Sequence, residues 1–140
     1  MADLKPFTPN PLPETRPYWV AARRHELTLP YCAACAAFHY YPRAVCPHCL
    51  SGALEWRRVS GRGRLHTFTI VYRGPKEFPL GTPYVLAMVE LDEGPRLMTN
   101  LVGVPPDPAA VRIGMRVEVV FMDVSDDAAL PHFRPAEPSR

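Results

Sequence analysis

Hydrophobic and polar residues alternate through the second half of the chain. Four segments follow a period of two and are rich in β-branched and aromatic residues: RLHTFTIVY (64–72), PYVLAMVEL (83–91), RLMTNLVGV (96–104) and MRVEVVFMDV (115–124). Turn-forming residues stand between them, at 73–75, 80–83, 92–95 and 113–114. Four or five strands joined by hairpin-like turns predict a small barrel, closed or partly open, rather than a parallel α/β sheet.

The pattern before the strands changes to that of a short helix. In TRPYWVAARRHEL (15–27), Thr15 stands at a capping position, Pro17 lies near the first turn and helix-forming residues follow. This arrangement predicts a helix over about residues 17–27. The side chains expected on its buried side are Trp19, Ala21, Ala22 and Leu27.

Both ends of the chain are rich in proline. Of the 18 prolines, five lie between residues 6 and 17, and three lie between residues 131 and 138. Because proline removes a backbone donor and fixes φ, we expect extended arms at both ends. The arms PFTPNPLPETRP and FRPAEPSR carry the aromatic residues Phe7 and Phe133. Such segments commonly become ordered only against a partner surface.

Every cysteine of the chain lies in CAACAAFHYYPRAVCPHC (32–49), as two Cys-x-x-Cys pairs ten residues apart. This spacing predicts that Cys32, Cys35, Cys46 and Cys49 hold one metal ion, because two such turns supply the four ligands of a tetrahedral structural zinc site. Three alternatives remain open at this point: unrelated buried thiols, disulfides, and iron, which also accepts tetrahedral sulfur. Four sulfur ligands close the site, so His39 and His48 are expected beside it or in solvent, and the metal is expected to be structural.

The charge and composition narrow the class of protein. A length of 140 residues with 47% hydrophobic residues suits one domain, or one domain with a small appendage. The formal charge of +2 falls to about zero if four thiolates bind a divalent ion, which argues against a generic nucleic-acid binder. The first residues contain no apolar run and no segment is long enough to cross a membrane, so we expect a cytoplasmic protein, in which disulfides are rare.

The segment from residue 56 to residue 76 contains basic residues and no acidic one. Its basic residues are Arg57, Arg58, Arg62, Arg64, Arg73 and Lys76, and an acidic counterpart follows late in the chain at Glu118, Asp123, Asp126 and Asp127. One interpretation is a solvated surface that pairs with its own acidic side. The other is a surface for an anion or a partner, because arginine suits phosphate groups of RNA or of a nucleotide-bearing cofactor.

No arrangement of residues typical of a catalytic site is found in the sequence. No serine lies in a G-x-S-x-G elbow, and the chain has neither a phosphate-binding loop nor a dinucleotide fingerprint. The candidate nucleophiles and bases are scattered along the chain, at Ser51, Ser60, Ser125, His25, His66 and His132. We therefore expect no catalysis by this chain alone.

Several ordered motifs over residues 17–136 resemble one known family. They are YWVAARRHEL (18–27), CAAC…PRAVCPHC (32–49), VSGRGRLHTFTIVYR (59–73), PYVLAMVELDEGPRLMTNLVG (83–103), IGMRVEVVFMDV (113–124) and LPHFRPA (130–136). Together they resemble the acyl-CoA-associated proteins with an N-terminal rubredoxin-like zinc ribbon and an OB-fold, long filed as a domain of unknown function. In one respect the sequence departs from that family: Ala36 stands where glycine often follows the first Cys-x-x-Cys, which makes a left-handed turn more costly but removes no ligand.

The resemblance implies a mainly β fold: a short N-terminal helix, a four-cysteine zinc ribbon and a five-stranded OB-fold barrel. The expected parts are an arm and helix over 1–28, the ribbon over 29–55 and the barrel over 56–136. Members of this family accompany thiolase-like enzymes and steroid side-chain aldolases that act on CoA thioesters. The resemblance therefore implies a non-catalytic accessory subunit with one structural zinc ion, in a complex with two copies of each chain and a CoA thioester that the two subunits could share at their interface. The alternative is an OB-fold protein that binds single-stranded nucleic acid.

Overall fold

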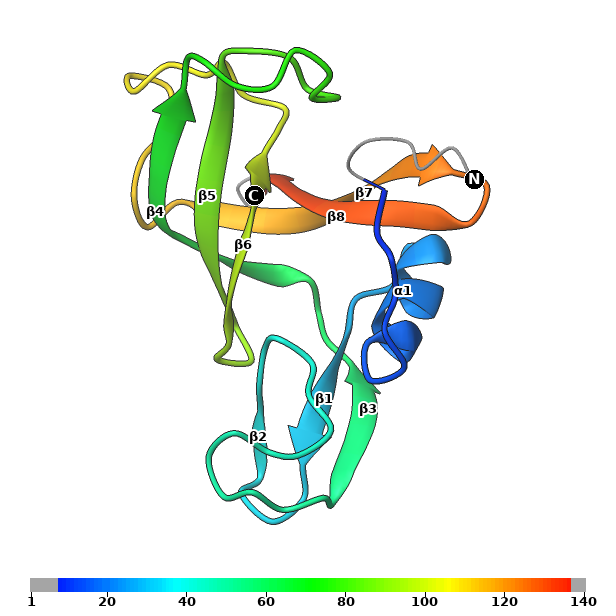
Figure 1. Cartoon of the computed structure of the whole chain (residues 1–140). Coiled ribbons are helices and arrows are strands. Elements are labelled where there is room, and N and C mark those ends of the chain that lie inside the picture. The colour runs from blue at the N-terminus through cyan, green and yellow to red at the C-terminus, as the bar shows by residue number, and fades with distance from the viewer. Residues whose placement is uncertain (1–7, 137–140) are drawn as a thin grey trace.

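A computed structural model describes residues 8–136 of the chain. It contains one helix, α1 (Arg16–Arg23), and eight strands in two sheets (Figure 1). The first three strands are β1 (Thr28–Cys32), β2 (Ala37–Phe38) and β3 (Leu54–Arg58), and they form a small sheet in the order β2-β1-β3. Figure 1 shows this sheet below the rest of the molecule, with α1 beside it.

The remaining five strands close into a barrel. They are β4 (Arg62–Val71), β5 (Tyr84–Leu91), β6 (Arg96–Leu101), β7 (Arg116–Ser125) and β8 (Ala128–Pro135), in the order β4-β5-β6-β8-β7. Neighbouring strands are antiparallel except β6 and β8, which run parallel where Leu101 meets Phe133, and β7 pairs with β4 to close the barrel. This is the five-stranded OB-fold, and the prediction of a mainly β fold is confirmed.

The core follows from the alternation seen in the sequence. In β5 every second residue is buried, and its inward side chains meet those of the other barrel strands. The largest side chains that are fully enclosed in the barrel are Leu65, Val85, Val89, Leu97, Val117 and Phe133. Burying such a side chain completely stabilises the fold by roughly 1.5–3 kcal/mol, so this layer accounts for much of the barrel's stability. Leu27 and Leu29 belong to the same cluster and join the helix and ribbon to the barrel.

The start of β4 requires glycine. A Cβ atom on Gly63 would lie 2.3 Å from the backbone oxygen of Glu90 on β5, closer than real Cβ atoms come. A bulge follows between Leu65 and Thr67 and changes which side of β4 faces the core. His66, at the bulge, is exposed.

The expected C-terminal arm is wrong at its start, because residues 133–135 belong to β8 and Phe133 is completely buried; residues 137–140 lie outside the described residues. The misleading signal was proline: Pro131 and Pro135 suggested irregular backbone. They are tolerated because β8 has an extended partner, β7, on one side but pairs with β6 only at Phe133 on the other. Phe7 lies outside the described residues.

The helix is shorter than the predicted range of 17–27. It ends at Arg23, and His25 has a left-handed backbone conformation with φ 61°, which stops the helical hydrogen bonds. Ala21 and Ala22 are buried as expected and Leu27 is buried after the helix, but Tyr18, rather than Trp19, is the fully buried aromatic residue. No helix among residues 8–136 is long and apolar enough to cross a membrane.

Candidate metal centre and the basic segment

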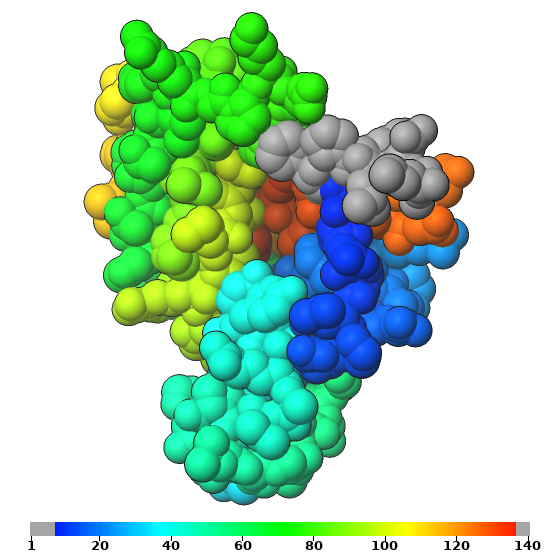
Figure 2. Space-filling model, viewed as in Figure 1, coloured from blue at the N-terminus to red at the C-terminus, as the bar shows by residue number. Residues whose placement is uncertain are grey.

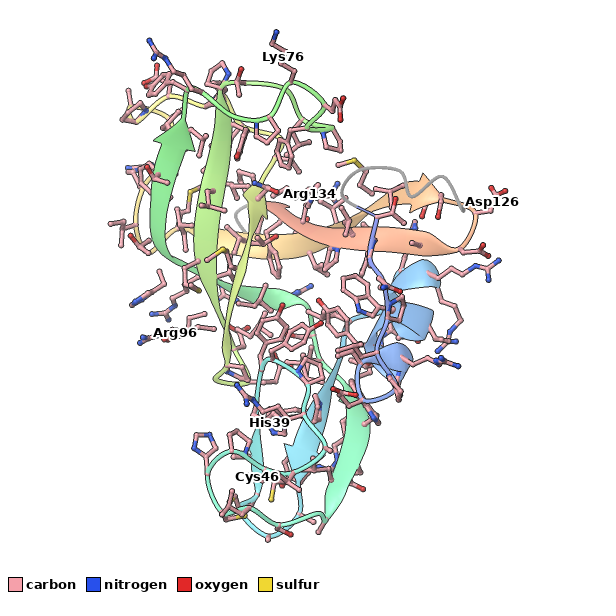
Figure 3. All side chains as sticks on the ribbon, viewed as in Figure 1. His39, Cys46, Lys76, Arg96, Asp126 and Arg134 are labelled. Carbon is pink, nitrogen blue, oxygen red and sulfur yellow. The ribbon has the colours of Figure 1, made fainter. Side chains whose placement is uncertain are left out.

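The two Cys-x-x-Cys turns bring all four thiols together. Cys32 is the last residue of β1, and the four sulfur atoms lie within 4.8 Å of one another. Figure 3 shows one of these residues, Cys46, at the ribbon end farthest from the barrel. Two of the separations are 3.6 Å, between Cys32 and Cys49, and 3.8 Å, between Cys35 and Cys46. A tetrahedral ion with metal–sulfur bonds of about 2.3 Å needs sulfur–sulfur separations of roughly 3.8 Å, so the cluster fits such an ion.

Backbone geometry around the sulfurs supports the same interpretation. The backbone N–H of Cys35 donates to the sulfur of Cys32, and the backbone N–H of His48 donates to the sulfur of Cys46. The nitrogen–sulfur distance is 3.4 Å in both hydrogen bonds. Ala36 has φ 55°, so the position where the family often has glycine is left-handed in this chain as well. Donors that point at sulfur stabilise the thiolate form that a metal requires.

Two of the four thiols have pKa values shifted in opposite directions. Burial opposes ionisation of the Cys46 thiol, but hydrogen bonds from the backbone N–H groups of Cys49 and His48, with help from neighbouring sulfurs, lower its pKa to about 6. A hydrogen bond with Cys49, burial and contacts with the other sulfurs raise the pKa of Cys35 to about 12. A divalent ion would stabilise the charged form of all four.

The two histidines beside the cluster have different surroundings. His48 is exposed, whereas His39 is only 4% exposed, and neither of its ring nitrogens has a hydrogen-bond partner among the described residues. Burial, followed by the positive charges of His48 and Arg43, lowers the pKa of His39. Neither histidine joins the cluster of potential metal ligands, which consists of the four cysteines.

The structure separates the basic segment into three groups. Arg57 and Arg58 lie on β3, where Arg57 pairs with Glu55 and stacks on Tyr31 with 3.7 Å to the ring centroid. Arg62 and Arg64 lie at the start of β4. Arg73 and Lys76 lie in the loop after β4, at the opposite end of the barrel (Figure 3). The segment therefore does not form one continuous patch.

The acidic counterpart pairs locally instead. Glu118 accepts a hydrogen bond from Arg134 at 3.0 Å, and Asp127 lies 3.7 Å from Arg23. Asp123 contacts His25 at 2.8 Å. Arg62, Arg64, Arg73 and Lys76 have no ion pair with any described residue.

The scattered serines and histidines stay apart. Ser60 donates to Glu93 at 3.1 Å, and His132 is buried on β8, where burial lowers its pKa. No hydrogen bond between a serine and a histidine occurs within residues 8–136.

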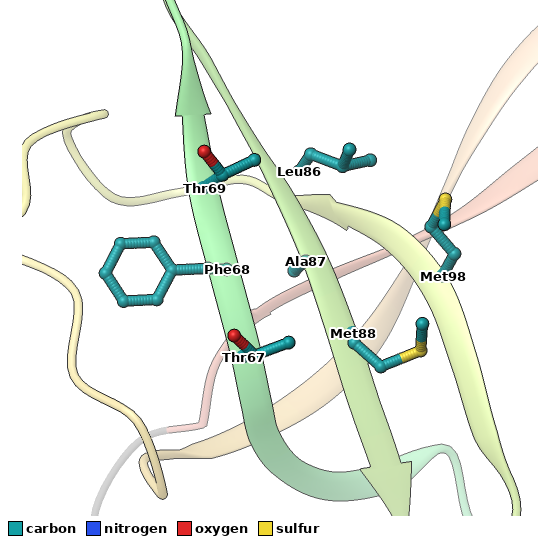
Figure 4. A pocket seen from close by; sticks show the side chains of 7 residues that line it. All are labelled: Thr67, Phe68, Thr69, Leu86, Ala87, Met88 and Met98. Atoms are coloured by element: carbon teal, nitrogen blue, oxygen red, sulfur yellow. The ribbon is translucent and has the colours of Figure 1, made fainter.

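A shallow depression on the barrel surface was not predicted from the sequence. Leu86, Met88 and Met98 point outward from β5 and β6 and line a shallow depression of about 250 Å³ together with Thr67 and Thr69 of β4 (Figure 4). Phe68 points to the other side of β4. The signal was present in the sequence: β5 is apolar on both sides, at alternate positions that should face solvent as well as those that face the core.

Two family profiles match consecutive parts of the chain. Residues 19–55 match the rubredoxin-like zinc ribbon domain of ChsH2, and residues 56–122 match the C-terminal OB-fold domain of ChsH2. The chain is also similar to one solved structure, titled Ltp2-ChsH2(DUF35) aldolase, with a TM-score of 0.79 and 34% identity. That match covers 91% of this chain and 98% of the other.

Three relatives extend the comparison. A DUF35 domain-containing scaffold protein of Methanothermobacter thermautotrophicus is 37% identical, over 75% of this chain and 78% of its own length. A probable enoyl-CoA hydratase alpha subunit of Thermomonospora curvata is 39% identical over 86% of this chain, which spans only 37% of that longer protein. The benzoylsuccinyl-CoA thiolase subunit BbsA of Geobacter metallireducens is 32% identical over 54% of this chain and 53% of its own length. With its four-cysteine ribbon followed by a closed five-stranded barrel, this chain belongs to the ChsH2/DUF35 family.

Proposed function

We propose that this chain is a non-catalytic accessory subunit of a thiolase-like enzyme that acts on CoA thioesters. The observation that carries the proposal is the likeness to the solved Ltp2-ChsH2(DUF35) aldolase chain, which extends over 98% of that chain and includes both the ribbon and the barrel. The names of two relatives, a scaffold protein and a thiolase subunit, support a role beside another enzyme. The finer proposal is an aldolase or thiolase that acts on substrates such as steroid side-chain intermediates.

The metal centre has an architectural part in this proposal. Cys32, Cys35, Cys46 and Cys49 would hold one zinc ion, which would cross-link β1, the first turn and the loop that precedes β3. Four protein ligands leave no position for water or substrate, so the ion would supply folding stability. The ribbon would then be a rigid element that can contribute to a partner surface.

The alternative, binding of single-stranded nucleic acid, finds less support on the barrel surface. OB-folds bind bases on the face of their second and third strands, which are β5 and β6 in this chain, by stacking them on aromatic residues. The outward residues in the middle of that face are Leu86, Met88 and Met98, none of which offers a ring for stacking.

A reconstitution experiment tests the proposal. The thiolase-like subunit of the source organism is produced alone and together with this chain, and each preparation is assayed for aldolase and thiolase activity on CoA thioesters. We expect a complex with two copies of each chain on size exclusion, activity only in the joint preparation, and no turnover by this chain alone. A thiolase-like subunit that is fully active by itself and forms no complex would refute the proposal.

A further inference from the structure

A second depression lies where the ribbon meets the barrel. The ribbon contributes residues 38–40, 43, 47 and 48 to its lining, and the turn between β5 and β6 contributes Gly94 and Pro95. Figure 2 shows the cyan surface of the ribbon adjoining the yellow-green surface of this hairpin. The volume of the depression is about 440 Å³, within the range of roughly 300–1,000 Å³ that is typical of sites for small ligands. We call it the junction pocket.

The junction pocket is lined by basic side chains. They are His39, Arg43 and His48, and no carboxylate lines the pocket within residues 8–136. Arg43 is exposed and has no ion pair with any described residue, including Glu14, which lines a separate depression together with it. Its guanidinium is always charged and offers five N–H donors in a planar fork. The pocket therefore contains one permanent positive charge that the described part of the chain does not pair.

The acidic residues nearest in the sequence to the barrel side of the pocket are already bound elsewhere. Glu93 accepts a hydrogen bond from the backbone N–H of Ser60 at 2.7 Å and another from the Ser60 hydroxyl at 3.1 Å. Asp92 accepts two hydrogen bonds from Arg116, at 2.8 and 2.9 Å. Neither carboxylate lines the junction pocket, so the turn between β5 and β6 does not supply the missing partner of Arg43.

His39 is the residue that points to a ligand. It is only 4% exposed, and both of its ring nitrogens are enclosed without a hydrogen-bond partner among the described residues. Buried polar groups are nearly always hydrogen-bonded, because an unmade bond costs free energy. The ring has no hydrogen bond to lose if it turns toward the pocket that it lines. Figure 3 shows His39 between Cys46 and the barrel in that view.

The charge and the lining select the kind of ligand. Burial, followed by the positive charges of His48 and Arg43, lowers the pKa of His39, so its ring is neutral near neutral pH and offers one N–H donor. One permanent charge matches a carboxylate, whereas a phosphate monoester carries about −1.5 to −2 charges at pH 7. The remaining lining includes the apolar side chains of Phe38, Pro47 and Pro95, which suit an apolar body.

We propose that the junction pocket binds a small organic acid, with its carboxylate held by Arg43 and the N–H of His39 and its apolar body against Phe38 and Pro95. The bound acid would contact the ribbon and the barrel together and so link the two. This site goes beyond the proposed function and is independent of it, because every residue that forms the site belongs to this chain.

The test titrates the full chain, loaded with zinc, with phenylacetate near neutral pH, and follows the histidine ring nitrogens by NMR. Phenylacetamide, which has the same shape without the charge, and inorganic phosphate are the comparison probes. Arg43→Gln removes the charge, and Arg112→Gln is its control, because Arg112 is also exposed and without an ion pair among the described residues. His39→Phe removes the N–H but keeps a buried ring, and its control is His66→Phe at an exposed position of β4.

We expect phenylacetate to bind with a Kd on the order of 1 mM or below and to shift the ring nitrogen signals of His39. Arg43→Gln should raise the Kd at least about tenfold and His39→Phe at least about threefold, because a charge-assisted bond contributes more than a neutral one. Both controls should change it less than about twofold. His39→Phe should keep its fold, since no hydrogen bond of the chain is lost; if it does not, Arg43→Gln and the His39 signals still decide the result.

Three results would overturn the assignment. The first is no binding of phenylacetate up to its solubility limit. The second is equal affinity for phenylacetamide, or an affinity that Arg43→Gln leaves unchanged, because the carboxylate would then not be recognised. The third is tighter binding of inorganic phosphate, which would show that the pocket prefers a different anion. The chain is titrated without a partner, so each of these results leaves the proposed function standing.

Discussion

Ala36 and Leu50 occupy equivalent positions in the two Cys-x-x-Cys turns and share one unusual backbone conformation. Each directly follows the second cysteine of a Cys-x-x-Cys pair, and their φ angles are 55° and 62°. The left-handed region is costly for residues with a Cβ atom, by about 1–2 kcal/mol. The two halves of the ribbon therefore contain the same turn, and in both a residue with a Cβ atom adopts the strained left-handed conformation.

Glycine at either position should stabilise the ribbon. We expect Ala36→Gly and Leu50→Gly each to raise the free energy of unfolding by about 0.5–1 kcal/mol, because relief of the left-handed strain exceeds the greater flexibility of the unfolded chain. Thermal unfolding of the metal-loaded protein measures this. Ala34→Gly is the matched control: Ala34 lies in the first turn but has no positive φ, so glycine there should destabilise. Equal effects of Ala34→Gly and Ala36→Gly would show that the backbone strain is not significant.

Elemental analysis should find one zinc ion per chain. Structural zinc sites in small modules contribute on the order of 10–16 kcal/mol of apparent binding free energy, so removal by a strong chelator should unfold the ribbon and change the fluorescence of Trp56 on β3. Cys46→Ser should lose the ion, whereas His48→Ala should keep it because His48 is exposed and outside the four-sulfur cluster. Iron as the dominant native metal, with redox activity, would contradict the assignment.

Stability should fall as the pH is lowered from 7.5 to 5.5. Burial lowers the pKa of His132 in the folded state. Near pH 6.5 this histidine therefore binds a proton in the unfolded chain but remains neutral in the folded chain. The stabilisation is present above the unfolded pKa and decreases as the pH falls through it, with a slope of at most about 1.4 kcal/mol per pH unit for one histidine.

The variant His132→Gln isolates this contribution, because glutamine does not titrate. Denaturant unfolding at several pH values should show a smaller pH dependence for His132→Gln than for the unmodified protein. The remaining dependence should include His39, whose pKa is lowered by burial and by the charges of His48 and Arg43. If the free energy of unfolding varied with pH identically in the two proteins, His132 would not contribute to the pH dependence of stability.

Truncation of Phe133 should damage the barrel severely. Phe133 is completely buried at the only place where β8 pairs with β6 within residues 8–136, so Phe133→Ala leaves a large cavity at the closure of the barrel. We expect a loss of about 3–5 kcal/mol in the free energy of unfolding, measured with denaturant. Phe121→Ala, on β7, should cost less than half as much because Phe121 is only partly buried. Similar losses in the two variants would contradict a special role for Phe133.

Local patterns in the sequence were enough to predict the four-cysteine cluster and most of the barrel. The spacing of Cys32, Cys35, Cys46 and Cys49 is itself the geometry of two metal-binding turns, and alternation with period two marks the strands because adjacent side chains in a strand point to opposite faces. Both signals arise between residues close together in the chain, so they need no knowledge of the fold.

Tertiary structure decided what depends on residues far apart in the chain. Phe133 lies in a proline-rich segment, and only its pairing with β6 and β7 makes that segment a strand. The basic residues between 56 and 76 looked like one group, but Arg62 lies at the start of β4 and Arg73 follows its end, so the length of the strand separates them. The fold also decides which arginines a carboxylate meets: Asp92 pairs with Arg116 across 24 residues of chain, and the charges of Arg64 and Arg62 help to lower its pKa. Closure of the barrel also turns Met88 and Met98 outward on adjacent strands, which no pattern within one strand could show.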